Sequence, residues 1–117
     1  METKALMERI VDILDGKKAE DIKVIRIGDL TILADYFVIA AGNSTTQVHA
    51  LSDNVEANLK EIGIEPFSVE GYRSAGWIIL DYASVLVHVF TQESRDFYDL
   101  DRLWSDGIKV DIDYNIN

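Results

Sequence analysis

The chain has 117 residues, of which 21 are acidic and 11 are basic, so its formal net charge is −10 and its isoelectric point lies near 4.4. An apolar content of 48% with 27% charged residues is typical of a single globular domain, placed here at residues 1–117, and excludes a disordered tail. The acidic excess argues against direct reading of nucleic acid, which needs clustered Lys and Arg, and favours a basic protein partner. The absence of cysteine excludes disulfides and thiolate chemistry.

Neither a signal peptide nor a membrane span is predicted. The N-terminal residues lack a basic stretch followed by an apolar run, and every uncharged apolar stretch is far shorter than a span. We therefore expect a cytoplasmic location.

The N-terminal part reads as one helix and two strands. Apolar residues recur at helical spacing over Thr3–Asp15, and Gly16 stands past the expected C-cap. Runs of β-branched residues predict strands at Asp21–Ile27 and Tyr36–Ala41. Because the second strand is apolar on both faces, we expect it at the centre of a sheet.

A second helix is predicted to begin at Ser44. Ser44 and Gln47 form the Ser-x-x-Gln pattern of a capping box. The helix ends at Gly63, and its apolar stripe comprises Val48, Leu51, Val55, Leu59 and Ile62.

The C-terminal part predicts three strands and a helix. Phe67–Glu70 is a short strand, Trp77–Tyr82 and Val85–Thr91 form a hairpin, and Glu93–Trp104 returns to helical spacing. The order predicts an α/β (α+β) domain with a mixed five-stranded sheet flanked by helices.

The hairpin separates two unlike faces. A turn at Ala83–Ser84 pairs Trp77 with Phe90, Ile79 with His88 and Asp81 with Leu86 on one face. This mixed face is either a binding surface with an aromatic anchor or a face covered by the last helix. The other face should be covered by helices because it is almost purely apolar, with Ile78, Leu80, Tyr82, Val85, Val87 and Val89.

The sequence gives little support for catalysis. His49 and His88 lie on different elements without ligands at metal-binding spacing, so no metal or cofactor is predicted. The junction Gly42-Asn43-Ser44 leaves a nucleotidyltransferase-like nucleotide site as the alternative. Such a site needs paired carboxylates on the next strand, which offers only Glu70, while Asp111-Ile112-Asp113 lies in the tail.

Acidic residues alternate with aromatic ones near the C-terminus. Residues 91–117 contain seven acidic and three basic side chains, interleaved with Phe97, Tyr98, Leu100, Leu103 and Trp104. This pattern suits a basic protein surface, and the alternative is an ordinary amphipathic helix. In either case we expect Phe97 and Leu103 in the core.

Several motifs, in this order and spacing, resemble the ribosomal silencing factor family, also called Iojap-like. They are Ala34-Asp-Tyr-Phe-Val-Ile39, Gly42-x-Ser44, Glu70-Gly71, Trp77-Ile-Ile-Leu-Asp81, Val87-His-Val-Phe90, Glu93-x-Arg95-x-Phe97-Tyr98 and Leu100-Asp101-x-Leu103-Trp104. The chain departs from the family at Ala83-Ser84, where Gly-Asp is usual, and at Asp101, where Glu is commoner.

The resemblance implies a nucleotidyltransferase-type fold without catalytic carboxylates, no enzymatic activity and no cofactor. It implies a translational repressor that binds the large ribosomal subunit through ribosomal protein fourteen and blocks joining of the small subunit. It also implies self-association as a homodimer. We expect the partner-binding residues to be Trp77, Asp81, His88, Phe90, Tyr98, Leu100, Asp101 and Trp104.

Overall fold

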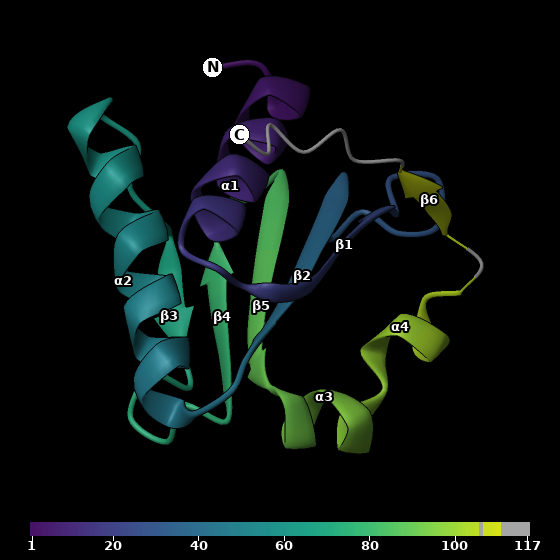
Figure 1. Cartoon of the computed structure of the whole chain (residues 1–117). Coiled ribbons are helices and arrows are strands. Elements are labelled where there is room, and N and C mark those ends of the chain that lie inside the picture. The colour runs from purple at the N-terminus through teal and green to yellow at the C-terminus, as the bar shows by residue number, and fades with distance from the viewer. Residues whose placement is uncertain (106, 111–117) are drawn as a thin grey trace.

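In the computed structural model, residues 1–105 and 107–110 are described, and they form a twisted mixed sheet with helices on both sides (Figure 1). The strands are β1 (Glu20–Arg26), β2 (Tyr36–Gly42), β3 (Ser68–Glu70), β4 (Trp77–Asp81), β5 (Val85–Thr91) and β6 (Ile108–Val110). Their order across the sheet is β3-β4-β5-β2-β1-β6. The β2–β5 pair is parallel and the other pairs described are antiparallel. The mixed sheet flanked by helices and the central place of β2 are confirmed.

Two long helices cover one face of the sheet. These are α1 (Thr3–Gly16) and α2 (Thr45–Glu61), which lie in front of the strands in Figure 1. They bury the main core against Ile78, Leu80, Val87 and Val89, as the hairpin pattern predicts. No helix in the described part of the chain has the length and apolarity needed to cross a membrane.

The start of α2 follows the predicted capping box. The Ser44 hydroxyl accepts a hydrogen bond from the Gln47 backbone N–H at 3.1 Å. The Gln47 side chain turns back to accept from the Asn43 N–H at 2.6 Å, one residue earlier than the usual reciprocal bond. At the end of α1, Gly16 is the last helical residue and Lys17 is the C-cap, so the prediction that Gly16 stands past the C-cap is wrong.

The hairpin of β4 and β5 has the predicted register. Trp77 lies opposite Phe90, Ile79 opposite His88, and Asp81 opposite Leu86. Ala83 takes a left-handed backbone conformation in the turn, with φ +68°, although alanine adopts positive φ less readily than glycine. The Asp81 carboxylate supports the turn by accepting from the Ala83 N–H at 2.7 Å.

The predicted helix over Glu93–Trp104 is wrong as a single helix. It is divided into α3 (Gln92–Tyr98) and α4 (Leu100–Leu103). In Figure 1, α3 lies below the strands and α4 lies to their right. Asp99 breaks it with φ +48° and ψ +50°, a conformation that aspartate tolerates better than most residues. The break redirects the chain so that Leu100 is buried.

A sixth strand extends the sheet beyond the five predicted. β6 pairs antiparallel with β1, Ile108 opposite Arg26 and Val110 opposite Val24. No strand is predicted after the last helix, so β6 is an addition to the predicted elements, while Asp111-Ile112-Asp113 lies outside the described residues. The three residues of β6 are too few for a periodic signal, and tertiary pairing with β1 decides their conformation.

We expect Gly71→Ala to destabilise the fold more than Gly63→Ala. Both glycines have positive φ, +77° and +80°, so alanine costs about 1 kcal/mol at either site from the backbone alone. A Cβ at Gly71 would also lie 2.0 Å from the Trp77 carbonyl oxygen, whereas nothing lies within 4 Å of a Cβ at Gly63. Urea unfolding should show a loss of about 3 kcal/mol or more for Gly71→Ala. Equal losses in the two variants would contradict the close contact.

Candidate functional site

The candidate site lies on the sheet face that α1 and α2 leave open. Strand register places three rows of side chains across this face. One row contains Trp77 and Phe90, the next Ile79, His88, Ile39 and Lys23, and the third Asp81, Leu86, Phe37 and Ile25. The second apolar cluster, separate from the main core, contains these members of the rows: Trp77, Phe90, Ile39, Leu86, Phe37 and Ile25.

Trp77 is the centre of an aromatic group at the α3 end of this face. Its ring stacks on Phe90 with centroids 4.9 Å apart and lies 4.8 Å from the ring of Tyr98. Its indole Nε1–H donates to His88 Nδ1 at 3.1 Å. Trp77 is thus held on three sides by β5 and α3 while remaining partly accessible.

Trp104 forms a second aromatic contact on the same face. It meets Phe37 edge to face at 5.2 Å, and Phe37 in turn meets His88 edge to face at 4.6 Å. The chain of rings therefore joins Trp104, after α4, to Trp77 on β4, although the two residues are far apart in sequence.

The predicted site residues are brought to one region but differ in accessibility. Tyr98 is 52% exposed, and Trp77, Asp81, Asp101 and Trp104 are partly exposed. His88, Phe90 and Leu100 are buried, so they support the surface from beneath. The helices α3 and α4 cover one end of the face, as the second interpretation predicts, and leave Ile79 and Leu86 partly open. Binding by the open part stays a prediction.

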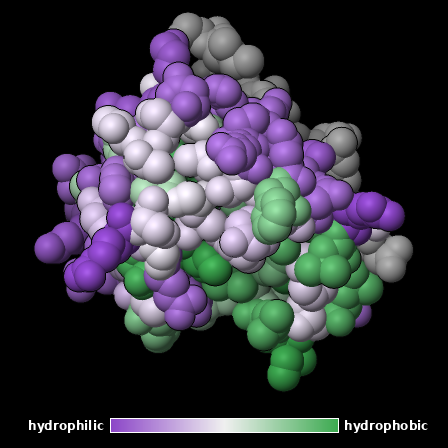
Figure 2. Space-filling view, turned by 90° about the horizontal axis from the view of Figure 1, so that it is seen from below, coloured by the Kyte–Doolittle hydropathy of each residue, from purple (hydrophilic) through white to green (hydrophobic). Residues whose placement is uncertain are grey.

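Phe97 and Leu103 are not core residues, contrary to the sequence-based expectation. Their exposures are 79% and 74%. On α3 the buried position is that of Arg95 rather than Phe97, and the break at Asp99 takes Leu103 off the face that a continuous helix would bury. Figure 2, seen from the α3 end, shows apolar colour gathered on one side of the molecule and hydrophilic colour on the other. The contact surface, as we use the term below, comprises Trp77, Phe97, Tyr98, Leu103 and Trp104.

Exposed acidic side chains border the contact surface. Glu93, Asp96 and Asp99 are exposed on α3 and at its end, and Arg102 is the exposed base of α4. Arg95 does not offset these acids at the surface because it is buried. The predicted acidic residues Asp106, Asp111 and Asp113 lie outside the described residues.

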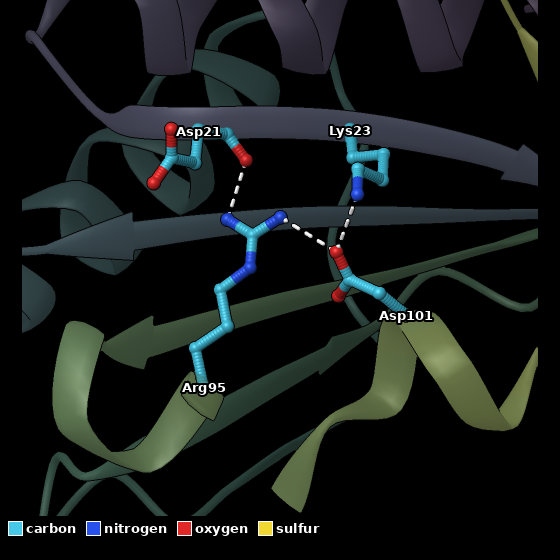
Figure 3. A network of polar contacts seen from close by, with 4 residues as sticks. All are labelled: Asp21, Lys23, Arg95 and Asp101. Carbon is cyan, nitrogen blue, oxygen red and sulfur yellow. Dashed lines mark hydrogen bonds and ion pairs between the residues drawn. The ribbon is translucent and has the colours of Figure 1, made fainter. Parts of the chain in front are cut away.

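A polar network fixes the corner between α3 and α4 (Figure 3). Asp101 Oδ2 lies 2.8 Å from Lys23 Nζ and 3.1 Å from Arg95 Nη2. Arg95 Nη1 also donates to the backbone carbonyl of Asp21. Burial alone would raise the pKa of Asp101, but hydrogen bonds from Lys23 and Arg95, and their charges, outweigh it and hold the pKa below its usual value.

Two backbone donors of the alternative nucleotide site are occupied by side chains of the chain itself. Ser44 and Gln47 accept from the Gln47 and Asn43 N–H groups that an incoming phosphate would otherwise engage. Glu70 is exposed on β3. Among residues 1–105 and 107–110, no group of three or more His, Asp or Glu side chains is arranged to hold a metal ion.

Comparison with known proteins places the chain among ribosome-associated factors. The family model "Ribosomal silencing factor during starvation" matches residues 1–117. The ribosomal silencing factor RsfS of Bacillus subtilis is 35% identical over 117 residues, covering 100% of this chain and 99% of the relative. A mouse protein named "Mitochondrial assembly of ribosomal large subunit protein 1" is 30% identical over 102 residues, covering 85% of this chain and 45% of the relative.

A solved structure supports the same relationship. A crystal structure of a Chromobacterium violaceum protein has a TM-score of 0.87 and 31% identity, covering 100% of this chain and 95% of that one. The likeness extends to the whole fold rather than to an isolated motif.

We expect His88 to make the fold sensitive to acid. Burial lowers its pKa from 6.5 to about 4, and Nδ1 must stay unprotonated to accept from Trp77. Between pH 6.5 and pH 4 the unfolded state therefore binds more protons at His88 than the folded state does. The free energy of unfolding should fall by about 3 kcal/mol as the pH drops from 7 to 4.

Urea unfolding at several pH values, compared with His88→Gln, isolates this contribution from that of the carboxylates. Glutamine can accept from the Trp77 indole and does not titrate. A pH dependence unchanged in His88→Gln would contradict the assignment.

Proposed function

The chain belongs to the ribosomal silencing factor family, and we propose that it is a translational repressor that binds the large ribosomal subunit. We propose further that it docks on ribosomal protein fourteen and blocks joining of the small subunit by occupying space that the small subunit needs. The proposal is one of binding, without a catalytic step or cofactor.

The observation that carries this proposal is the contact surface with its acidic border. Phe97, Tyr98 and Leu103 are large apolar or aromatic side chains exposed by 52% to 79%. Exposed apolar side chains gathered on one side of a domain are typical of protein interaction sites, and aromatic residues contribute most to affinity there. The side chains beneath, including Phe90 and Leu100, are buried and keep the surface rigid.

The charge of the chain favours a basic protein over RNA as the surface that it meets. A net charge of −10 is repelled by phosphates. Glu93, Asp96 and Asp99 present negative charge beside the aromatic residues. Ribosomal proteins carry positive charge, so complementary charge would speed the encounter and orient it while the aromatic residues hold the complex.

The relatives' names support the large subunit as the target. The mouse relative is named for assembly of the ribosomal large subunit, and several bacterial relatives are named ribosomal silencing factors. A role at the bacterial-type ribosome would place the protein in the cytoplasm. We also propose that a homodimer forms through the contact surface, in competition with the ribosome.

We expect Tyr98→Ala to weaken binding to purified large subunits about tenfold, equivalent to about 1.4 kcal/mol, because it removes an exposed ring at the centre of the contact surface. Co-sedimentation with large subunits measures the loss, and the fraction of joined ribosomes in a subunit-association assay should rise accordingly.

Phe67→Ala is the matched control for this experiment. Phe67 is 81% exposed and its N–H donates to the Asp81 carbonyl, at the end of β4 away from Trp77. Its loss should therefore leave binding unchanged. Failure of the unmodified protein to sediment with large subunits or to reduce joining would refute the proposed function. Light scattering of the same samples separates a loss of binding from a change in self-association.

The charge contribution predicts a salt-dependent effect. Asp96→Lys should weaken binding several-fold at low salt and less at high salt, because ions screen exposed charges. Glu61→Lys, at the exposed end of α2, changes net charge equally but lies away from the contact surface. Titrations at two salt concentrations should therefore separate the variants, and equal losses in both would show that only the net charge matters.

A further inference from the structure

We propose that Arg95 and Asp101 are positioning residues, which tie α4 to β1 and so hold Leu103 and Trp104 in the orientation that the partner meets. This inference rests on the proposed function. It assigns Asp101 a place beneath the contact surface rather than in direct contact with the partner.

Helix geometry alone does not fix the place of α4. Asp99, at φ +48°, interrupts the helical path after Tyr98, and α4 has only four residues. A helix of one turn has too few internal hydrogen bonds to be stable by itself. Its position must therefore come from contacts with the rest of the molecule.

Arg95 supplies the contact from α3. Its side chain is only 7% exposed, and its two terminal nitrogens point in different directions (Figure 3). One donates to the Asp21 carbonyl at the start of β1, and the other donates to Asp101 on α4 at 3.1 Å. A planar guanidinium that joins two elements in this way fixes their relative positions better than a single bond would.

Lys23 completes the tie from β1. Its ammonium lies 2.8 Å from the same oxygen of Asp101 that accepts from Arg95. The other carboxylate oxygen, Oδ1, is buried and has no hydrogen-bond partner among the described residues. Oδ1 thus faces the interior and Oδ2 is already paired with two cations of this chain, which leaves the carboxylate badly placed to meet a cation of the partner.

The tie lies next to the residues that it would position. Leu100, beside Asp101, is 7% exposed and packs in the second apolar cluster. Leu103 and Trp104 follow within one turn, and Trp104 rests edge to face on Phe37 at 5.2 Å. Movement of Asp101 would therefore move two residues of the contact surface.

Hydrogen exchange of the free protein tests the tie directly. The amides of Leu103 and Trp104, which donate to the Asp99 and Leu100 carbonyls, report on α4. In Asp101→Asn they should exchange at least tenfold faster, whereas amides of β2 and β5 keep their protection. Lys23→Gln should give a smaller increase, and Asp101→Glu, which keeps the carboxylate, should remain close to the unmodified protein. Asp96→Asn, an exposed acid of α3, is the control for loss of charge.

Binding to purified large subunits at low and high salt then tests the positioning role. Asp101→Asn should lose affinity about tenfold at both salt concentrations, and Asp101→Glu should restore most of it. Unchanged exchange in α4, or faster exchange with unchanged binding, overturns the proposal. A loss confined to low salt overturns it too, because it would make Asp101 a direct contact. If the unmodified protein does not bind large subunits, the proposed function fails and the positioning role with it, while the exchange result still decides whether the network fixes α4.

Discussion

The parallel pairing of β2 with β5 is the constraint on which the contact surface depends. Seven residue pairs, from Tyr36 with Val85 to Gly42 with Thr91, set one register at the centre of the sheet. Parallel strands require a crossover, and α2 lies within it on the same face as α1. Val38, Val87 and Val89 therefore face both long helices. The alternate residues, including His88 and Phe90, face the other side, where the second apolar cluster includes Leu100 of α4 and Ile27 and Ala34 of the β1–β2 connection.

Local signals explain what the sequence predicted well. The alternation of Trp77 to Tyr82 and Val85 to Thr91 fixes the hairpin register because a shift of one residue would expose the whole apolar set. The start of α2 follows from the capping by Ser44 and Gln47. Both features involve residues close in sequence, where spacing carries most of the information.

The rest depended on contacts between distant residues. No glycine or proline near Asp99 indicates a helix break in the sequence. The break is favoured instead by the burial of Leu100 and by the ion pairs of Asp101 with Lys23 and Arg95. Similarly, β6 exists through pairing with β1. The motif Glu93-x-Arg95-x-Phe97-Tyr98 lies on α3, but the sequence did not distinguish the inward Arg95 from the outward Phe97.

The same contacts change the interpretation of the charge. A count of charged residues includes Arg95 on α3 and Asp101 on α4 in the charge of this region. In the structure, however, these two side chains pair with each other, and Lys23 from β1 pairs with the same carboxylate. The charge that a partner meets there comes from Glu93, Asp96 and Asp99 against Arg102. Because the buried Arg95 and the half-buried Lys23 both pair with Asp101, the region can be rigid and still negative outside. If the protein docks as we propose, exposed RNA phosphates would repel it and a basic protein among them would attract it, so the repulsion itself would help to select the docking position.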